Sequence, residues 1–203
     1  MNNKKSLMPI YHGNEIIPNI TFIVNVAWGN EYLIKLLELL KKRDICLTFF
    51  LEGRWIEQNL ELALMIKDSN HEIGNHSYSH KDMKTLSVDE IHMEITKTNE
   101  IINELLGVKP KYFTPPYGYF DTRVLEIATR LEMVTVLWSL DTMDWKIENQ
   151  NEIIDKIVPN IKNGSIILMH PTESSLKALP YMIEKALDMN YKIVTINEML
   201  LFL

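Results

Sequence analysis

Apolar residues along this chain fall into short runs that alternate with helical stripes. The runs are rich in β-branched and aromatic residues and have few polar interruptions, which is typical of buried strands in a parallel sheet. The pattern predicts strands over residues 20–26, 47–51, 72–75, 112–114, 134–138, 165–169 and 192–195. It predicts helices over residues 30–44, 55–67, 87–106, 121–131, 151–161 and 179–190, and a short helix at the C-terminal end.

Strand and helix alternate about seven times without a break in composition, which predicts one α/β domain. An open doubly wound sheet and a barrel both agree with this pattern. Residues 1–19 form an irregular lead-in punctuated by Pro9, Gly13 and Pro18, and the domain covers residues 20–203. We expect Asn30 to cap the first helix and Pro180 to lie in the first turn of the helix over 179–190.

Composition excludes several classes of protein. The chain has 203 residues, of which 46% are hydrophobic and 24% are charged, as in ordinary globular proteins. The net charge of -6 argues against a nucleic-acid partner, and no apolar run is long enough for a transmembrane segment. The start of the chain has no apolar stretch of signal-peptide length, so the protein is cytoplasmic or an export segment is absent from this sequence. The single cysteine, Cys46, excludes an internal disulfide.

Two histidines lie four positions apart directly after the expected strand over 72–75. If the backbone becomes helical after Asn75, His76 and His80 project from one helix face and can share a divalent metal. Histidines with this spacing also occur on solvated helix faces. The rest of the chain therefore decides between a metal site and a surface pair.

Other reactive side chains also follow expected strands. The carboxyl ends of parallel strands meet at one edge of a sheet, where α/β proteins place their sites. Core packing is the competing interpretation for each aromatic and histidine. The residues are Asn25 after the first strand, Pro115, Pro116 and Tyr117 after the fourth, Asp141, Asp144 and Trp145 after the fifth, and His170 after the sixth.

Five ordered blocks, the first of them altered, resemble those of the polysaccharide deacetylases with the NodB homology domain, also called carbohydrate esterase family 4. His76–His80 resembles H-[ST]-x-x-H, Thr114–Gly118 resembles an R-x-P-Y-type block, Asp141–Trp145 resembles D-x-x-D-W, and Leu168–His170 resembles L-x-H. The resemblance runs from about residue 20 to the C-terminus. It implies a distorted (β/α)7 barrel that removes N-acetyl groups from a cell-envelope glycan, either peptidoglycan or a chitin-like polymer.

The resemblance also implies roles for individual residues. His76 and His80 would bind a divalent metal, with zinc expected before cobalt. His170 would be the general acid, held by Asp144. Tyr117, Pro116, Trp145 and Asp141 would line the substrate groove.

The first block departs from the family, which has T-F-D-D-G with a general base followed by a metal ligand. Thr21–Gly29 carries no carboxylate and resembles the variant of sporulating Gram-positive bacteria, in which a W-G pair follows the strand. Asn25 is the nearest replacement for the base, and Ala27 offers nothing to a metal. Thr114 stands where the family has the Arg that pairs with the base, so the base and its cation are missing together.

Two hypotheses follow. In the first, the chain is a weakly active metal-dependent hydrolase of amide-linked acetyl groups, with a metal that is weakly bound or absent. In the second, it is a catalytically inactive NodB-fold protein that binds glycan or has a structural role. An unrelated barrel hydrolase or isomerase with His170 as its base would leave the ordered blocks unexplained. The resemblance suggests an extracytoplasmic location, while the glycan and the oligomeric state are not determined by the sequence.

Overall fold

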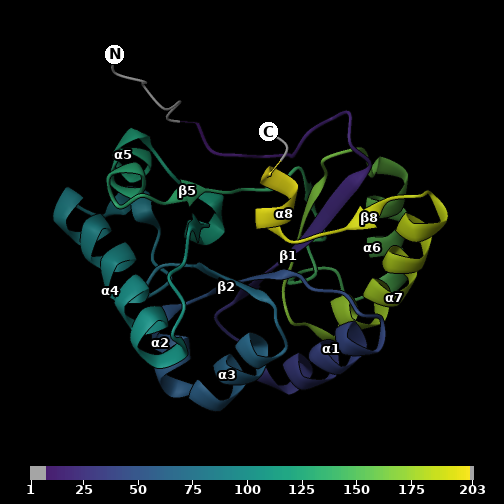
Figure 1. The fold of residues 1–203 in the computed structure, drawn as a ribbon, viewed down its shortest axis with the longest axis horizontal. Coiled ribbons are helices and arrows are strands. Elements are labelled where there is room, and N and C mark those ends of the chain that lie inside the picture. Colours follow the sequence, from purple (N-terminus) through teal and green to yellow (C-terminus); the bar gives the residue numbers. More distant parts are fainter. Residues whose placement is uncertain (1–7, 202–203) are drawn as a thin grey trace.

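The computed structural model describes residues 8–201, in which helices surround a curled parallel sheet (Figure 1). The strands pair in the order β5-β4-β3-β2-β1-β7-β6, and β8 pairs with β1. Within residues 8–201 no ladder joins β5 to β6, so the sheet is a half-barrel that stays open at this seam. The prediction of a distorted barrel is therefore confirmed. The strands are β1 (Asn19–Val26), β2 (Thr48–Leu51), β3 (Glu72–Asn75), β4 (Tyr112–Phe113), β5 (Val134–Thr135), β6 (Leu140–Asp141), β7 (Ile166–Met169) and β8 (Lys192–Ile193).

The helices α1 to α7 lie around the outside of the sheet, and α8 lies across its centre in the view of Figure 1. Short 3₁₀ turns, η1 to η3, interrupt the connections. The helices are α1 (Asn30–Lys42), α2 (Gly53–Gln58), α3 (Leu60–Asp68), α4 (Val88–Leu106), α5 (Thr122–Arg130), α6 (Gln150–Ile157), α7 (Glu173–Asp188) and α8 (Ile196–Leu200), and the turns are η1 (Met83–Thr85), η2 (Pro116–Gly118) and η3 (Val158–Asn160).

Alternation along β1 separates two apolar cores. Phe22 and Val24 belong to the outer core between sheet and helices, whereas Ile23 faces the inside of the half-barrel. Side chains two residues apart share a face, so Asn25 points to the same side as Ile23. By the same alternation His170 follows Leu168, which also belongs to the inner cluster. The strand pleat therefore directs both polar side chains inward.

Helix α8 closes the amino-terminal end of the half-barrel. Its first N–H groups, those of Ile196 and Asn197, donate to Thr48 Oγ1 at 2.9 Å and to Glu72 Oε2 at 3.1 Å. Thr48 and Glu72 are the first residues of β2 and β3. The carboxyl ends of the strands are thus left for the site, on the opposite side from α8.

The structure corrects three expectations about helices. Gly29, with a φ of 87°, is the cap of α1, and the Asn30 side chain instead accepts from Trp55 Nε1 at 2.7 Å. The expected helix over 55–67 is divided into α2 and α3 at Asn59, whose side chain donates to the Trp55 carbonyl at 2.9 Å. Pro180 lies in the interior of α7, because Thr172 caps that helix. The apolar stripe conceals these breaks, since each depends on polar contacts that the stripe does not include: the bond from Trp55 to Asn30 joins distant segments, whereas the bonds of Asn59 and Thr172 are local.

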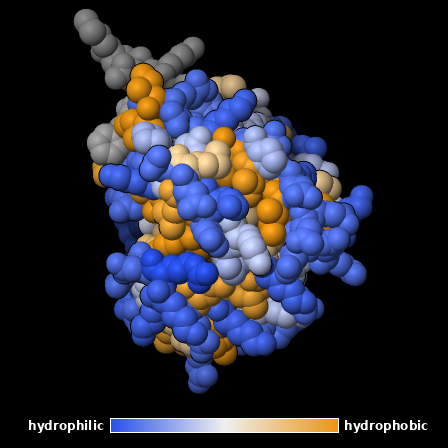
Figure 2. Space-filling model, turned by 90° about the vertical axis from the view of Figure 1, so that its right-hand side faces the viewer, coloured by the Kyte–Doolittle hydropathy of each residue, from blue (hydrophilic) through white to orange (hydrophobic). Residues whose placement is uncertain are grey.

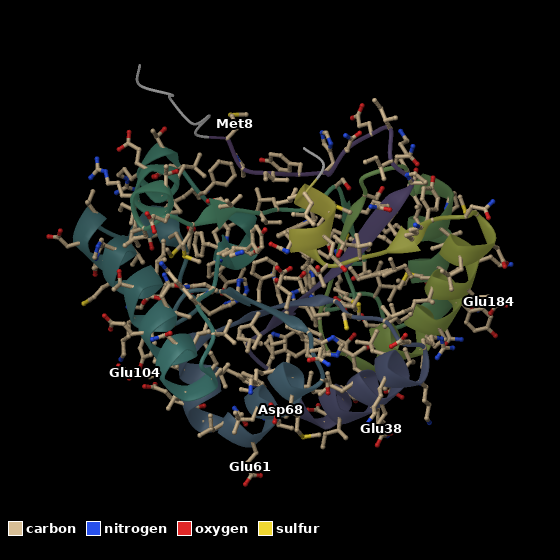
Figure 3. All side chains as sticks on the ribbon, viewed as in Figure 1. Met8, Glu38, Glu61, Asp68, Glu104 and Glu184 are labelled. Carbon is tan, nitrogen blue, oxygen red and sulfur yellow. The ribbon has the colours of Figure 1, made fainter. Side chains whose placement is uncertain are left out.

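The outer surface is predominantly polar. Glu38, Glu61, Glu104 and Glu184 lie at the rim of the molecule and point away from it (Figure 3). The face that carries α6 and α7 is largely hydrophilic, with apolar groups visible between the polar ones (Figure 2). Among the described residues, none of the helices combines the length and apolar character that crossing a bilayer requires.

Candidate functional site

A pocket of about 390 Å³ lies at the carboxyl ends of the strands. It brings together most of the side chains singled out in the sequence. Asp144 and Pro116 are buried and are not among the lining residues. The lining consists of Asn25, Trp28, His76, His80, Tyr117, Tyr119, Trp138, Asp141, Trp145, Leu168 and His170.

The two histidines meet without a helix between them, so the condition under which they would share one helix face is not fulfilled. After Asn75 the chain forms a loop, with φ values of 65° at Ser77 and 53° at His80. Asn75 Oδ1 accepts from the Ser77 N–H at 2.7 Å, which favours a turn over a helix. The rings of His76 and His80 nevertheless lie with their centroids 5.0 Å apart at an interplanar angle of 71°.

A buried carboxylate from α4 holds this loop in place. Glu94, which is 8% exposed, accepts from the N–H groups of Tyr78 at 2.9 Å and Ser79 at 2.7 Å. Its other oxygen accepts from the Ser79 hydroxyl. From the opposite side, Arg54 Nη2 donates to the Ser79 carbonyl at 2.8 Å. The positions of the two imidazoles therefore depend on a carboxylate that the sequence analysis did not identify.

Both imidazoles are kept neutral. His76 Nδ1 donates to the Thr114 carbonyl at 2.7 Å, which leaves Nε2 with a free lone pair. Burial, reinforced by the neighbouring His80, lowers the pKa of His76 well below its ordinary value. Burial, reinforced by His170, also lowers the pKa of His80. Neutral imidazole is the form that binds metals.

His170 is held by a buried carboxylate. Its Nδ1 lies 2.8 Å from Asp144 Oδ1, and its backbone N–H donates to Asp144 Oδ2 at 2.7 Å. Asp144 also accepts from Thr172 Oγ1 at 3.3 Å and from the Ser175 hydroxyl. With Nδ1 engaged, Nε2 is the ring nitrogen left for a ligand. The His170–Asp144 pair is therefore assembled as the resemblance implies.

Aromatic rings form much of the pocket wall. Trp28 stacks on His170, with ring centroids 5.6 Å apart and an interplanar angle of 11°. The rings of Tyr117 and His80 pack in a T-shaped arrangement, with centroids 4.8 Å apart. Tyr117 and Trp145 are each 57% exposed, so their faces remain available to a ligand. Sugar rings with apolar faces commonly pack on such side chains.

The pocket also holds two polar side chains from β1 and β6. Asn25 is only 4% exposed, and its Oδ1 has no hydrogen-bond partner among the described residues. Asp141 Oδ1 accepts from the Met143 N–H at 2.8 Å. Ala27, in contrast, is not a lining residue. An unpaired buried amide oxygen is costly, which indicates that a donor from a ligand is expected at Asn25.

The donor set does not fit a resident divalent metal of the kind that the resemblance implies. Two neutral imidazoles, His76 and His80, are in place, but a structural or catalytic zinc site usually has three or more protein ligands. Among residues 8–201, histidine, cysteine, aspartate and glutamate side chains form no group of three that could hold a metal ion. The amide of Asn25 is a weak substitute for a carboxylate.

Sequence reasoning missed four lining residues: Trp28, Tyr119, Trp138 and Leu168. The W-G pair and the L-x-H block contain Trp28 and Leu168, so a signal existed for these two. Tyr119 lies well beyond the end of β4, and Trp138 was expected to be the last residue of the strand over 134–138, so neither was recognised as a residue that follows a strand. Only the folded loops bring their rings to the pocket.

Comparison with known proteins agrees with this geometry. A family model described as polysaccharide deacetylase matches residues 18–136. YlxY of Bacillus subtilis (strain 168) is 44% identical over 192 residues, which cover 95% of this chain and 60% of that protein. The peptidoglycan-N-acetylmuramic acid deacetylase PdaA of the same organism is 31% identical over 195 residues, which cover 94% of this chain and 74% of that protein.

Solved structures give the same result. A CE4 family pseudoenzyme from Bacillus anthracis superposes with a TM-score of 0.93 at 46% identity, covering 96% of this chain and 69% of that chain. A mutant described as having restored enzymatic activity superposes with a TM-score of 0.94 at 45% identity, covering 96% and 71%. This chain spans about three fifths of the length of YlxY. Because the family model covers more than half of the sequence and PdaA is similar over most of both chains, this chain belongs to the polysaccharide deacetylase family.

Proposed function

We propose that this domain binds N-acetylated glycan of the peptidoglycan class and hydrolyses its acetamide groups very slowly or not at all. The names of relatives such as PdaA support the substrate class and the class of reaction, hydrolysis of a carbon–nitrogen amide bond. Because those relatives act on peptidoglycan, as their names state, we propose an extracytoplasmic location. The chemistry of the pocket supports the low rate.

One observation carries the proposal. The acid pair His170–Asp144 is complete, with 2.8 Å between Nδ1 and Oδ1, while the proposed base position is the neutral amide of Asn25. An amide cannot take a proton from water at neutral pH. Loss of general-base catalysis alone costs about 10²- to 10⁴-fold in rate. Binding does not need the missing groups and is retained.

The proposed binding roles follow from the exposed surfaces. Tyr117 and Trp145 present faces on which a sugar ring can pack, and Asp141 can accept from a sugar hydroxyl. His170 Nε2 and the unpaired Asn25 Oδ1 can bond to the acetamide. Zinc, or cobalt after it, is proposed to bind only weakly through His76 and His80, because a third ligand is missing.

The test combines binding, acetate release and metal content. Calorimetric titration with a tetramer of N-acetylglucosamine should show binding, and acetate release should stay near the uncatalysed level with and without added zinc. Trp145→Ala should weaken binding by about fivefold, as loss of one aromatic contact implies. Tyr181→Ala is the control, because Tyr181 is equally exposed at 54% but lies on α7 outside the pocket.

Two results would overturn the proposal. Rapid acetate release that depends on His170, together with one equivalent of zinc in the purified protein, would show an active metalloenzyme. Absence of glycan binding at millimolar oligomer would show that the domain does not recognise this class of ligand.

A further inference from the structure

A row of aromatic rings continues from the pocket toward a lysine. The ring of Tyr117 lies 5.8 Å from that of Tyr119, at an interplanar angle of 42°. Tyr119 is 48% exposed, and the Lys84 ammonium lies 4.3 Å from its ring centroid. A ring that carries a cation on its face presents an apolar surface and a positive charge side by side.

The backbone of η2 directs these rings. Tyr117 has a φ of 60° and Gly118 a φ of 68°, so two successive residues adopt the left-handed conformation. A Cβ atom at Gly118 would approach the Trp138 ring to 2.9 Å, so this position has no room for a side chain. The left-handed backbone conformation costs free energy in a residue other than glycine, and it usually persists only where surrounding contacts stabilise it. The turn thereby carries Tyr117 and Tyr119 out along the pocket rim.

Arg123 links η1, which contains Lys84, to the segment that contains Tyr119. Its guanidinium donates to the carbonyls of Leu86 at 2.9 Å and Lys84 at 3.0 Å, so it binds the backbone of η1 and of the residue that follows it. The same guanidinium pairs with Asp121 at 2.6 Å, only two residues after Tyr119. The distance between Lys84 and Tyr119 is therefore maintained by the hydrogen bonds and the ion pair of Arg123, and it does not depend on a single surface contact.

The charge of Lys84 is not neutralised by a neighbouring acid. None of the ion pairs found within residues 8–201 includes Lys84. Asp82 accepts from the Lys84 backbone N–H, and Asp121 is occupied by Arg123. The carboxylate of the pocket itself, Asp141, accepts from the Met143 N–H. Lys84 is therefore an exposed cation beside an aromatic ring, with no ion-pair partner among the described residues.

We propose that Tyr119 and Lys84 form a subsite for a sugar residue that carries a carboxylate, adjacent to the sugar bound in the pocket. This inference rests on the proposed glycan binding and adds the class of residue that the neighbouring position selects. The Tyr119 ring supports the apolar face of the sugar, and the Lys84 ammonium pairs with the carboxylate. Tyr117 connects the two positions.

The experiment compares three oligosaccharides of equal length by calorimetric titration at low salt. The first is a neutral N-acetylglucosamine oligomer, the second alternates N-acetylglucosamine with N-acetylmuramic acid and has no peptide, and the third is a glucuronate-containing oligomer. Lys84→Met should weaken binding of the acidic oligomers by about two- to fivefold and leave the neutral oligomer unchanged. Added salt should reduce the preference of the wild type for the acidic oligomers.

Lys97→Met is the matched control. Lys97 also places its ammonium over a tyrosine ring, that of Tyr78 at 3.5 Å, but neither residue lines the pocket. This substitution should not change any of the three affinities. Tyr119→Leu should weaken all three oligomers, because each would lose the aromatic platform.

The outcomes separate this inference from the proposed function. Equal losses on both acidic oligomers would support recognition of a sugar carboxylate in general, and a loss on the muramic oligomer alone would support recognition of its lactyl ether. Unchanged binding of both acidic oligomers to Lys84→Met, while the neutral oligomer still binds, would overturn the subsite and leave glycan binding intact. Failure of all three oligomers to bind the wild type would overturn both.

Discussion

Asp144 lies directly behind His170, with 2.8 Å between Asp144 Oδ1 and His170 Nδ1. The side chain of Asp144 is fully buried, and its second oxygen accepts from the His170 backbone N–H, so one carboxylate fixes both the ring and the strand end. Trp28 covers a face of the same ring. Such a pair holds an imidazole in one orientation whether or not catalysis takes place.

Replacing this carboxylate should cost stability. Asp144→Asn preserves size but removes an acceptor from several buried donors, and we expect the free energy of unfolding to fall by about 2–4 kcal/mol. Urea denaturation measures the change. Asp188→Asn is the control, because Asp188 pairs with Lys185 at 3.5 Å on the exposed surface and should change stability by less than about 0.5 kcal/mol. Similar values for the two variants would contradict the structural role of Asp144.

Restoring a carboxylate should tighten metal binding. Ala27→Asp would add a third ligand to His76 and His80, and we expect the zinc dissociation constant to fall by roughly tenfold or more. Competition with a zinc-sensitive dye measures it, with Asn160→Asp on the exposed surface as control.

An unchanged constant in Ala27→Asp would contradict the placement of the missing ligand at residue 27. The family block ends in glycine, and counting back from Gly29 places its base at Ala27 and its metal ligand at Trp28, whereas the placement that this variant tests has the base at Asn25 and the ligand at Ala27. Trp28 lines the pocket, whereas Ala27 does not. Tighter zinc binding by Trp28→Asp and not by Ala27→Asp would therefore assign the ligand position to residue 28.

The loop that carries the two histidines should depend on Glu94. Glu94→Ala leaves the N–H groups of Tyr78 and Ser79 without their acceptor, and we expect a loss of about 2–3 kcal/mol in unfolding free energy. Glycan affinity should fall as well, since His76 and His80 line the pocket. Glu100→Ala, on the exposed side of the same helix, should change neither quantity. Unaltered stability and affinity in Glu94→Ala would show that the loop holds its shape without the carboxylate.

The contribution of His71 to stability should decrease as the pH falls from 6.5 toward 4. Burial lowers the pKa of His71 to about 4, so the unfolded chain binds a proton in this range that the folded chain does not. The contribution of this group to the free energy of unfolding therefore decreases as the pH decreases, by about 3 kcal/mol at most. His71→Asn keeps an acceptor for the Leu47 N–H, which donates to Nδ1 at 3.2 Å, and should flatten the profile.

The profile of His71→Asn should not become level, because the pKa of buried His76 is lowered as well. His92→Asn replaces an exposed histidine of α4 and is the control, with a profile equal to that of the wild type. If His71→Asn lost stability more steeply than the wild type at low pH, His71 would not be a cause of the acid destabilisation.

The sequence alone determined most of the alternation of strands and helices, although it did not predict β6 and it joined α2 and α3 into one helix. Buried strands such as β1 and β7 need continuous apolar runs, and such runs can be identified without the fold. Two local capping signals in the sequence were confirmed, whereas the cap expected at Asn30 was wrong. Ser87 and Glu90 form the capping box of α4, and Asp121 caps α5, because these bonds join neighbours in the chain.

Only the tertiary structure decided how the site is held together. The loop after Asn75 is not helical, since its N–H groups are satisfied by Glu94 from a distant helix. The stacking of Trp28 on His170 and the position of Lys84 over Tyr119 join segments that lie far apart in the chain. A pattern of apolar and polar positions predicts which faces are buried. It does not predict which distant residue each polar group binds, because that depends on the curvature of the sheet and on the conformation of the loops.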